Sequence, residues 1–335
     1  MSSKQKIIIC GATGFIGRNI LERFLDLPEY ELYAIFCRTQ PPQELARDPR
    51  VRFLKADLRI KNEVDRILSG ADILIQAAAT TSGAKDILGK PYHHVTDNAI
   101  MNSLVFRSCY ENRVKHVVFF SCTVMYGERP WPIRESDFDY QIMDQYFGVG
   151  WTKVYLEKMC EFYARISGTK YTVIRHSNIY GPHDKYDLER SHVFGATIAK
   201  AMTVKNGQLT VWGDGTEERD LLHVGDLVRF VHTVLSRQSA PFELINIGAG
   251  RSISIKDLVT AIVARSKRDL RIEFDKSKPT IPYKLALNID RAKNLCGWSP
   301  QIRLEDGIDE CLSWYREHYM NGRDQATQAA DVHEL

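Results

Sequence analysis

The sequence lacks the features that mark several special classes of protein. Its seven cysteines form no CxxC pair and no Cys/His cluster with zinc-ligand spacing, and such an odd, scattered set predicts reduced thiols and a cytoplasmic protein. No signal-peptide core follows the N-terminus, and no apolar run approaches the roughly 18 residues of a membrane span. Charge of one sign is not in excess either, since 45 basic residues face 42 acidic ones. We therefore expect no nucleic-acid partner, no membrane partner and no bound metal.

What is present is the composition of an ordinary globular protein. The 335 residues are 44% hydrophobic and 26% charged, which is ample for a sizeable core and excludes disorder, collagen and coiled coil as the main architecture. The length suits one large α/β unit, or one domain with a smaller lobe. Cys10 and Cys37 lie in or at the end of apolar runs and are expected to be buried.

Short apolar runs alternate with helical patterns along the first half of the chain. Strands are predicted over residues 7–10, 32–36, 51–54, 73–75, 116–120 and 171–174, and helices over 15–27, 62–68, 98–112 and 150–167. This alternation predicts a parallel, doubly wound α/β sheet of the Rossmann type.

A glycine-rich motif stands directly between the first predicted strand and the first predicted helix. Its residues Gly11, Gly14 and Gly17 form a GxxGxxG pattern. Glycine permits the tight turn and lets a pyrophosphate approach the backbone, while the helix N-terminus supplies N–H donors. The motif therefore predicts a dinucleotide site, and the alternative is a turn that serves packing alone.

The residue that would select NAD over NADP is missing from its usual place. A carboxylate that binds the ribose 2′-hydroxyl is expected about 20 residues after the glycines, but no acidic residue stands between Glu31 and Glu44. Arg38 is there instead, which favours NADP through a 2′-phosphate contact or caps the adenosine of NAD. Asp57, just past the third predicted strand, is placed to meet the adenine amino group or to cap a helix.

The remainder of the chain is less regular. Residues 178–182 are expected to form a loop, and residues 243–248 a strand that returns to the main sheet. The predicted parts are a dinucleotide-binding domain over 1–175 with that returning strand, a substrate-binding lobe over 176–242 and 249–320, and a disordered tail over 321–335.

These motifs and several others resemble the extended short-chain dehydrogenases/reductases, the family of NDP-sugar epimerases, dehydratases and reductases. The further motifs are Asp57 with Leu58, the alanines at 77–79, the stretch that ends in Tyr126 and Gly127, Lys153, and the segments 175–182 and 219–226. The resemblance covers about residues 6–317, and segments 181–184, 191–193 and 211–215 are most similar to GDP-fucose synthase and its GDP-sugar relatives. The implied cofactor contacts are Gly11, Thr13, Gly14, Phe15, Ile16, Gly17, Arg38, Asp57, Leu58, Ala77, Ala78, Ala79 and Lys153.

The resemblance implies a catalytic Ser/Thr, Tyr and Lys that act on a sugar hydroxyl or ketone beside the nicotinamide. Lys153 matches the lysine, whose ammonium lowers the pKa of the tyrosine and holds the ribose. The family's tyrosine, however, aligns with Val149, and the Ser/Thr position holds Cys122, a weak hydrogen-bond partner. Thr123 is the alternative source of the hydroxyl. Lys153, Thr123, Tyr126 and water are the candidates for the missing acid/base.

Substrate contacts are implied in the same way, at Asn178, His183, His192, Val193, Trp212 and Arg219. Arg219 is expected to grip the diphosphate, since a guanidinium binds phosphate bidentately. Trp212 is expected to stack on the nucleotide or to pack in the core. His192 matches the epimerisation histidine of GDP-fucose synthase, but Val124 replaces that enzyme's cysteine. A C3/C5 double epimerisation is therefore not expected, and the alternative role of His192 is a hydrogen bond to substrate.

The function that the resemblance implies is that of an NAD(P)-dependent oxidoreductase at C4 of a nucleotide-activated sugar. A GDP-sugar is favoured, in the synthesis of cell-surface polysaccharide precursors, with a tightly held cofactor. The alternatives are a reductase or epimerase with a relocated acid/base, and a catalytically silent nucleotide-sugar binder. Family members dimerise through the helices that match 98–112 and 150–167, so a homodimer is expected, with Tyr155, Phe162 and Tyr163 in the core or in that interface.

Overall fold

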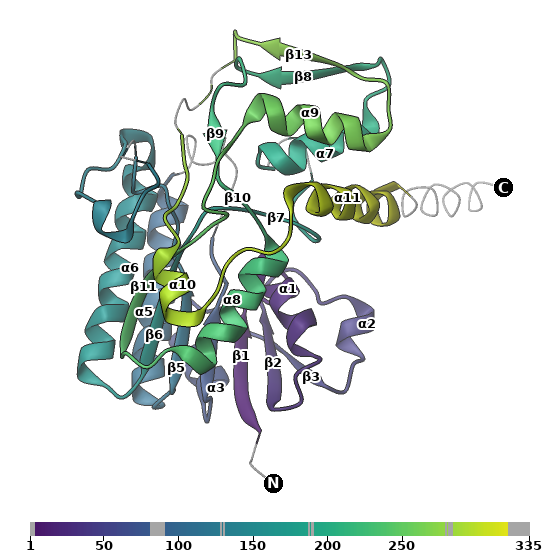
Figure 1. Cartoon of the computed structure of the whole chain (residues 1–335). Helices are drawn as coiled ribbons and strands as arrows, with labels where there is room; N and C mark the ends of the chain where they lie inside the picture. The colour runs from purple at the N-terminus through teal and green to yellow at the C-terminus, as the bar shows by residue number, and fades with distance from the viewer. Residues whose placement is uncertain are drawn as a thin grey trace, which may run out of the picture.

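A seven-stranded sheet forms the centre of the computed structural model, which describes residues 4–80, 91–127, 129, 131–186, 188, 191–278, 280 and 284–320. Its strands are β1 (Gln5–Cys10), β2 (Tyr30–Phe36), β3 (Val51–Lys55), β4 (Ile73–Gln76), β5 (His116–Phe120), β6 (Lys170–His176) and β11 (Phe242–Ile247). They lie in the order β11-β6-β5-β4-β1-β2-β3, all parallel (Figure 1). This confirms the predicted doubly wound α/β sheet, whose strand order reverses between β1 and β4. The predicted tail over 321–335 lies outside the described residues.

Helices cover both faces of the sheet (Figure 1). One face carries α1 (Phe15–Phe24), α8 (Val224–Arg237) and α10 (Asp290–Cys296), and the other α3 (Lys61–Leu68), α5 (Pro91–Glu111) and α6 (Phe147–Ile166). Ile7 and Ile9 of β1 join the first core, whereas Ile8 and Cys10 join the second. Strands that are covered on both faces read as continuous apolar runs. Each such side chain contributes about 1.5–3 kcal/mol when it is fully buried.

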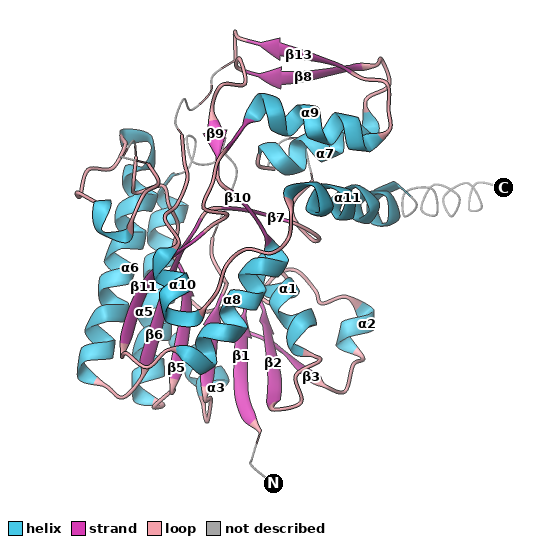
Figure 2. Cartoon of the chain, viewed as in Figure 1, coloured by secondary structure: helices cyan, strands magenta, loops and turns pink. Residues whose placement is uncertain are grey.

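A smaller lobe lies beyond the carboxyl ends of the sheet strands (Figure 2). Its elements are β7 (Asn178–Tyr180), α7 (Val193–Thr203), β8 (Gln208–Trp212), β9 (Glu218–Arg219), β10 (Leu221–His223), β12 (Ile253–Ser254), α9 (Ile255–Ser266), β13 (Arg271–Asp275) and α11 (Leu304–Tyr315). The strands pair as β7 with β10, β9 with β12 and β8 with β13. The helices pack on a core of their own. Because β7 begins directly after β6, this lobe stands over the edge of the sheet where ligands bind in open α/β folds.

Short elements complete the described chain. They are α2 (Gln43–Ala46), two 3-10 turns, η1 (Glu135–Asp137) and η2 (Asp144–Tyr146), and a π-helical turn, η3 (Arg316–Met320). Within the described residues, no helix combines the length and the apolar character of a membrane span.

Several local expectations differ from the structure. Asn178–Tyr180 forms a strand rather than a loop, because its backbone pairs with Leu221–His223 far along the chain. Cys37 is exposed rather than buried, since it lies just beyond the end of β2. Tyr155 and Phe162 are also exposed, which leaves the interface and not the core as their expected place.

Candidate active site

The three glycines of the motif meet different surroundings. A Cβ on Gly11 would lie 2.8 Å from the backbone of Ala78, and a Cβ on Gly17 would lie 2.2 Å from the carbonyl oxygen of Gly11. These two glycines let strand, loop and helix pack closely, and the φ of Gly11 is also left-handed, at 72°. A Cβ on Gly14, in contrast, would touch only the Gly11 oxygen, at 3.3 Å. The middle glycine therefore borders open space, as a pyrophosphate site requires.

The start of α1 is suited to an anion. Gly14 is the N-cap, it offers no side-chain hydrogen bond to the helix, and the first turn holds no acidic residue. The first N–H groups of a helix have no partner within the helix, and they carry the positive end of its dipole. Thr13, Phe15 and Ile16 flank the cap and are half-buried. The residues present thus fit a dinucleotide phosphate.

Arg38 and Asp57 are the residues predicted to meet the adenosine. They follow β2 and β3, which pair along their length, so both stand at one edge of the sheet. Arg38 is exposed and has no ion pair with any described residue. Hydrogen bonds from Arg59 lower the pKa of Asp57, and the charge of Arg38 lowers it further. Leu58 is buried in the core, so only its backbone is available to a ligand.

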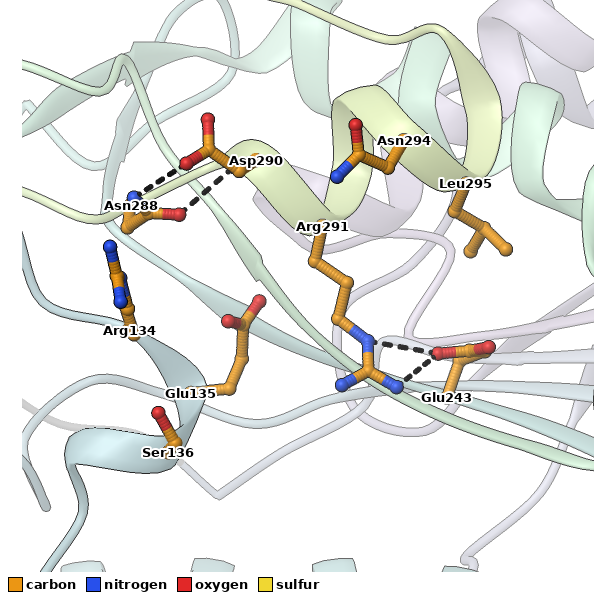
Figure 3. Close-up of a pocket in the computed structure, with 9 residues that line it drawn as sticks. All are labelled: Arg134, Glu135, Ser136, Glu243, Asn288, Asp290, Arg291, Asn294 and Leu295. Carbon is orange, nitrogen blue, oxygen red and sulfur yellow. Dashed lines mark hydrogen bonds and ion pairs between the residues drawn. The ribbon is translucent and has the colours of Figure 1, made fainter.

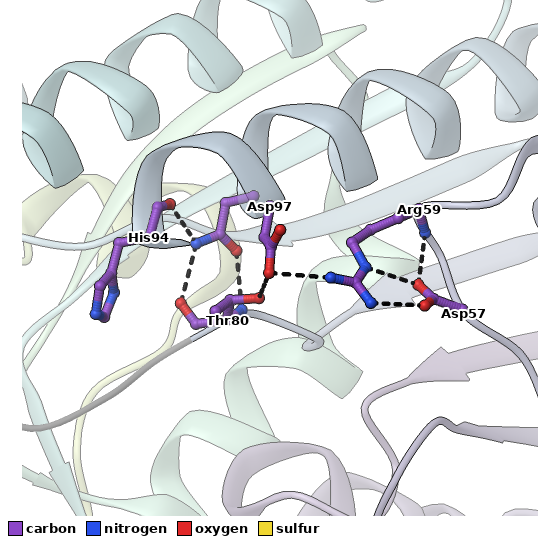
Figure 4. A network of polar contacts seen from close by, with 6 residues as sticks. Asp57, Arg59, Thr80, His94 and Asp97 are labelled. Atoms are coloured by element: carbon purple, nitrogen blue, oxygen red, sulfur yellow. Dashed lines mark hydrogen bonds and ion pairs between the residues drawn. The ribbon is translucent and has the colours of Figure 1, made fainter. Parts of the chain in front are cut away.

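A polar network links Asp57 to α5 and to the loop after β4 (Figure 4). Arg59 donates to both oxygens of Asp57, at 3.0 and 2.8 Å, and to Asp97 of α5 at 3.2 Å. Asn98 bonds both the N–H and the carbonyl of Thr80, each at 3.0 Å. The N-cap of α3 is Ile60, so Asp57 is not a helix cap. The bonds of Asn98 fix the loop after β4 to α5.

That loop carries the three alanines of the predicted cofactor site. Ala77 donates from its backbone N–H to the Cys10 carbonyl at 3.2 Å, so the loop continues along β1. Ala77 and Ala78 are half-buried and Ala79 is exposed. The alanines border the glycine loop, as the close approach of Gly11 to Ala78 shows.

The predicted catalytic residues meet at the carboxyl end of β5. The Nζ atom of Lys153, on α6, donates to the carbonyl of Phe120 at 2.7 Å. Burial lowers the pKa of Lys153. Burial also raises the pKa of the half-buried Cys122, against the opposing charge of Lys153. Val149 lies one turn before Lys153 on the same helix and is half-buried. Lys153, Cys122 and Val149 therefore lie close together at the carboxyl end of β5.

Two other hydroxyl candidates lie in the interior. Thr123 is 7% exposed and Tyr126 is fully buried. The Tyr126 hydroxyl donates to Asn246 at 2.7 Å and accepts from Arg175 at 2.9 Å. Burial raises its pKa above the ordinary value. Tyr126 is therefore a structural residue and does not supply the missing acid/base.

A buried ion pair between β6 and α6 lies next to the site. Arg175 of β6 donates to both oxygens of Glu157 on α6, at 3.0 and 2.7 Å, and each side chain is at most 4% exposed. Ser121 donates to the same carboxylate at 2.5 Å. Removing one partner of such a pair typically costs about 3–5 kcal/mol, because the other charge is left buried and unpaired. The pair fixes α6, and with it Lys153, against the sheet.

His176, which the sequence reasoning did not single out, belongs to the same site. It ends β6, is half-buried, and its ring centroid lies 6.3 Å from that of Phe120. Burial lowers its pKa to about 4, and the charges of Lys153 and His192 lower it too. The available signal was its place inside the 175–182 motif, directly after Arg175.

The predicted substrate residues are spread over the smaller lobe. Asn178 pairs its backbone N–H with Asp220, Val193 begins α7 and is half-buried, and Arg219 donates to its neighbouring carbonyl at 2.9 Å. Trp212 ends β8 and is 55% exposed, so it is not a core residue. His192 is exposed and occupies the N-cap position of α7 without a side-chain hydrogen bond to the helix, and its charge lowers the pKa of His176.

His183 stands apart from this group. Its Nε2 atom lies 3.0 Å from Glu22 of α1, and its ring packs edge-on against Trp314 at 5.2 Å between centroids. The histidine thus joins the smaller lobe to α1. The structure brings His192, but not His183, to the Lys153 group.

A separate hollow lies between η1, β11 and α10 (Figure 3). It is lined by Arg134, Glu135, Ser136, Glu243, Asn288, Asp290, Arg291, Asn294 and Leu295. Arg291 is already paired with Glu243 at 2.6 Å. No residue of the predicted site lines this hollow, and we assign it no part in the chemistry.

Comparison with known proteins places the chain in a family. The model of the NAD dependent epimerase/dehydratase family matches residues 7–248. The chain is 28% identical over 323 residues to dTDP-4-dehydro-6-deoxy-D-allose reductase of Streptomyces sp, covering 94% of this chain and 97% of that one. It is 32% identical over 267 residues to GDP-L-fucose synthase of Sinorhizobium fredii, covering 76% and 82%.

Among solved structures, UDP-glucuronic acid 4-epimerase from Bacillus cereus, in complex with UDP-glucuronic acid and NAD, matches with a TM-score of 0.82. It is 26% identical, and the match covers 94% of this chain and all of that one, 100%. The chain therefore belongs to the NAD dependent epimerase/dehydratase family. The prediction of an enzyme with a nicotinamide dinucleotide cofactor is confirmed at that level.

Proposed function

We propose that the protein is an NAD(P)-dependent oxidoreductase acting at C4 of a nucleotide-activated sugar, with a GDP-sugar favoured. The observation that carries this is the position of Lys153, which lies beside Cys122 and His176 at the carboxyl end of the sheet. The names of the relatives, a GDP-L-fucose synthase and a dTDP-sugar reductase, support the substrate class. The proposed role of the reaction is in the synthesis of cell-surface polysaccharide precursors.

In this proposal each part of the site has one task. The glycine loop and the start of α1 hold the pyrophosphate, Asp57 faces the adenine, and Lys153 holds the nicotinamide ribose. The bound nicotinamide supplies the redox chemistry by exchanging a hydride with the sugar carbon. Cys122 orients the sugar oxygen only weakly, because a thiol is a poor hydrogen-bond partner. With Val149 in the tyrosine's place, turnover is slow and the cofactor stays bound.

The proposed cofactor preference is NADP. Arg38 is the cation at the end of β2, it is exposed, and it has no ion pair within the described residues. A free guanidinium in this place fits a 2′-phosphate, which it can bind bidentately.

The smaller lobe is proposed to hold the nucleotide sugar; of the predicted range 176–242 and 249–320, α8 and α10 pack instead on the central sheet. Trp212 presents an exposed aromatic face on which a nucleobase can stack. Arg219 is proposed for the diphosphate, and Asn178, His192 and Val193 for the sugar. His183 is also proposed to contact the substrate. To do so, its ring would have to exchange its present contact with Glu22 for the ligand.

The proposal is tested on the purified protein. The near-ultraviolet absorbance of reduced nicotinamide is measured first, because a tightly held, reduced cofactor supports an oxidoreductase. A thermal-shift panel of GDP-mannose, UDP-glucose and dTDP-glucose follows, with NAD or NADP present, since selective binding raises the melting temperature. Protein that binds nucleotide sugars but exchanges no hydride in either direction would instead support the silent binder.

A further inference from the structure

We infer that His176 takes the place of the missing phenol and moves the proton of the sugar hydroxyl. The inference rests on the proposed function and deepens it. His176 ends β6, and its ring packs on Phe120 at 6.3 Å between centroids. The carbonyl of Phe120 holds the Lys153 ammonium at 2.7 Å. The imidazole and the ammonium therefore contact the same residue at the edge of the sheet that faces the smaller lobe.

The hydrogen bond of the ring settles which nitrogen is free. Nδ1 of His176 lies 2.8 Å from the carbonyl oxygen of Ser177. A carbonyl can only accept, so Nδ1 carries the hydrogen and donates it. In the neutral ring the lone pair is then on Nε2. Within the described residues Nε2 has no hydrogen-bond partner, and the side chain is only half-buried. One nitrogen held and the other open is the arrangement of a general base.

Burial, with a smaller part from the charges around the ring, keeps the imidazole of His176 neutral. Lys153 faces it from α6 and His192 from the start of α7, and with burial, the larger cause, they lower the pKa of His176 to about 4. Cys122, which stands beside Lys153, is held as the neutral thiol. The imidazole is therefore unprotonated near neutral pH and able to accept a proton. The negative diphosphate of a nucleotide sugar raises this pKa when it enters the site.

The proton transfer to His176 accompanies a hydride transfer between the sugar and the nicotinamide. In the oxidising direction the O–H bond at C4 of the sugar breaks, and its proton forms an N–H bond at Nε2. The hydrogen on C4 leaves with its electron pair to the oxidised nicotinamide, and the C–O bond becomes a carbonyl. In the reducing direction the imidazolium returns its proton to the oxygen.

The other candidates for the proton acceptor are Tyr126, Thr123 and Cys122, and each is buried, hydrogen-bonded or held protonated. Tyr126 is fully buried with its hydroxyl bonded to Asn246 and Arg175. Thr123 is buried, and burial raises the pKa of Cys122. Of the groups that contact Phe120 beside Lys153, His176 combines an open lone pair with a neutral ring.

The variant that tests this is His176→Asn. Its amide can keep the bond from the Nδ1 position to Ser177, and it lacks Nε2. We expect the chemical step to slow by about 10²- to 10⁴-fold, while the affinity for GDP-mannose, measured by calorimetry, changes less than about threefold. The matched control is His232→Asn on α8, whose ring lies outside the site.

A second readout does not depend on turnover. The imidazole C–H resonance of His176, assigned by its loss in His176→Asn, should titrate near the pKa given above in the free protein and at higher pH with GDP-mannose bound. A wild-type protein that turns over a nucleotide sugar, with His176→Asn as fast and with an unchanged pH profile, overturns the inference. So does a resonance that GDP-mannose leaves unmoved. Wild-type protein that exchanges no hydride with GDP-mannose, UDP-glucose or dTDP-glucose overturns the proposed function instead.

Discussion

Gly14 is the glycine of the cofactor loop at which a side chain would point into free space. Its φ of −90° is open to any residue, and a Cβ there would meet only the Gly11 oxygen at 3.3 Å, so Gly14→Val should require a small local shift and leave the fold intact. The branched side chain would occupy the space that a pyrophosphate needs, and cofactor binding should fall by more than tenfold. Calorimetry with NAD and NADP measures this. Gly168→Val, at a glycine with no neighbour within 4 Å, is the control, and equal affinity in both variants would contradict the assignment.

Arg38 decides between the two cofactors in the proposed site. Arg38→Ala removes the exposed cation beside Asp57, and a charge-assisted contact to a 2′-phosphate is lost with it. NADP affinity should fall about tenfold or more, and NAD affinity far less. Competition binding with both cofactors provides the ratio. If both affinities fall equally, Arg38 does not contact a 2′-phosphate.

Val149 offers a gain-of-function test. Lys153 lies one helical turn beyond it, so it can lower the pKa of a phenol placed there. Val149→Tyr should speed hydride exchange and make the rate rise more steeply with pH, at a stability cost of about 1–3 kcal/mol if the space is tight. Stopped-flow absorbance measures the step. Placing Val149→Tyr in the His176→Asn background tests whether the phenol restores the lost rate, and an unchanged rate in both backgrounds would contradict the prediction.

At the scale of elements, a buried histidine between two strands should make the free energy of unfolding depend on pH. His116 of β5 is 5% exposed, and its Nε2 atom lies 2.8 Å from the Thr172 hydroxyl of β6, which itself donates to Gln238. Nε2 therefore donates. Burial lowers the pKa of His116 to about 4 from an ordinary 6.5.

A lowered histidine pKa means that the unfolded chain binds the proton first as the pH falls. The free energy of unfolding should therefore decrease between about pH 6.5 and 4, by roughly 3 kcal/mol for this group. His116→Gln, which can keep the donor to Thr172, should flatten that slope in urea titrations over this range. His232→Gln, at a half-buried histidine of α8, serves as the control and should leave the slope unchanged. A slope equal in all three proteins would contradict the assignment.

The elements that were predicted from the sequence carry a local signal. The strands from Ile7 to Ile174 are continuous apolar runs, which burial on both faces requires, and a glycine motif marks the first turn. β7 has no such signal, because three residues gain their strand geometry from β10. The site divides in the same way. Lys153 was found by its spacing in a motif, whereas the place of His176 follows from Phe120 and Ser177, contacts that only the folded chain brings together.

At the scale of the whole molecule, one face of α6 is left uncovered. Tyr155, Phe162 and Ile166 recur at helical spacing and are 54%, 54% and 48% exposed, and Tyr110 of the adjacent α5 is 43% exposed. An apolar stripe of this kind is typical of a surface that another chain covers. We predict that a second copy packs here and forms a helical bundle.

Stable interfaces typically bury about 1,200–2,000 Å² in total. A charge at the centre of such an interface should disrupt it, because the charge would be buried without a partner. Phe162→Asp should convert the dimer to a monomer without unfolding it, because the side chain contributes little to the core of the single chain. Light scattering after size exclusion measures the mass. Ile60→Asp, at an apolar residue that is 48% exposed at the start of α3, is the matched control and should remain dimeric. Wild-type protein that is already monomeric, or a Phe162→Asp variant that stays dimeric, places the interface elsewhere.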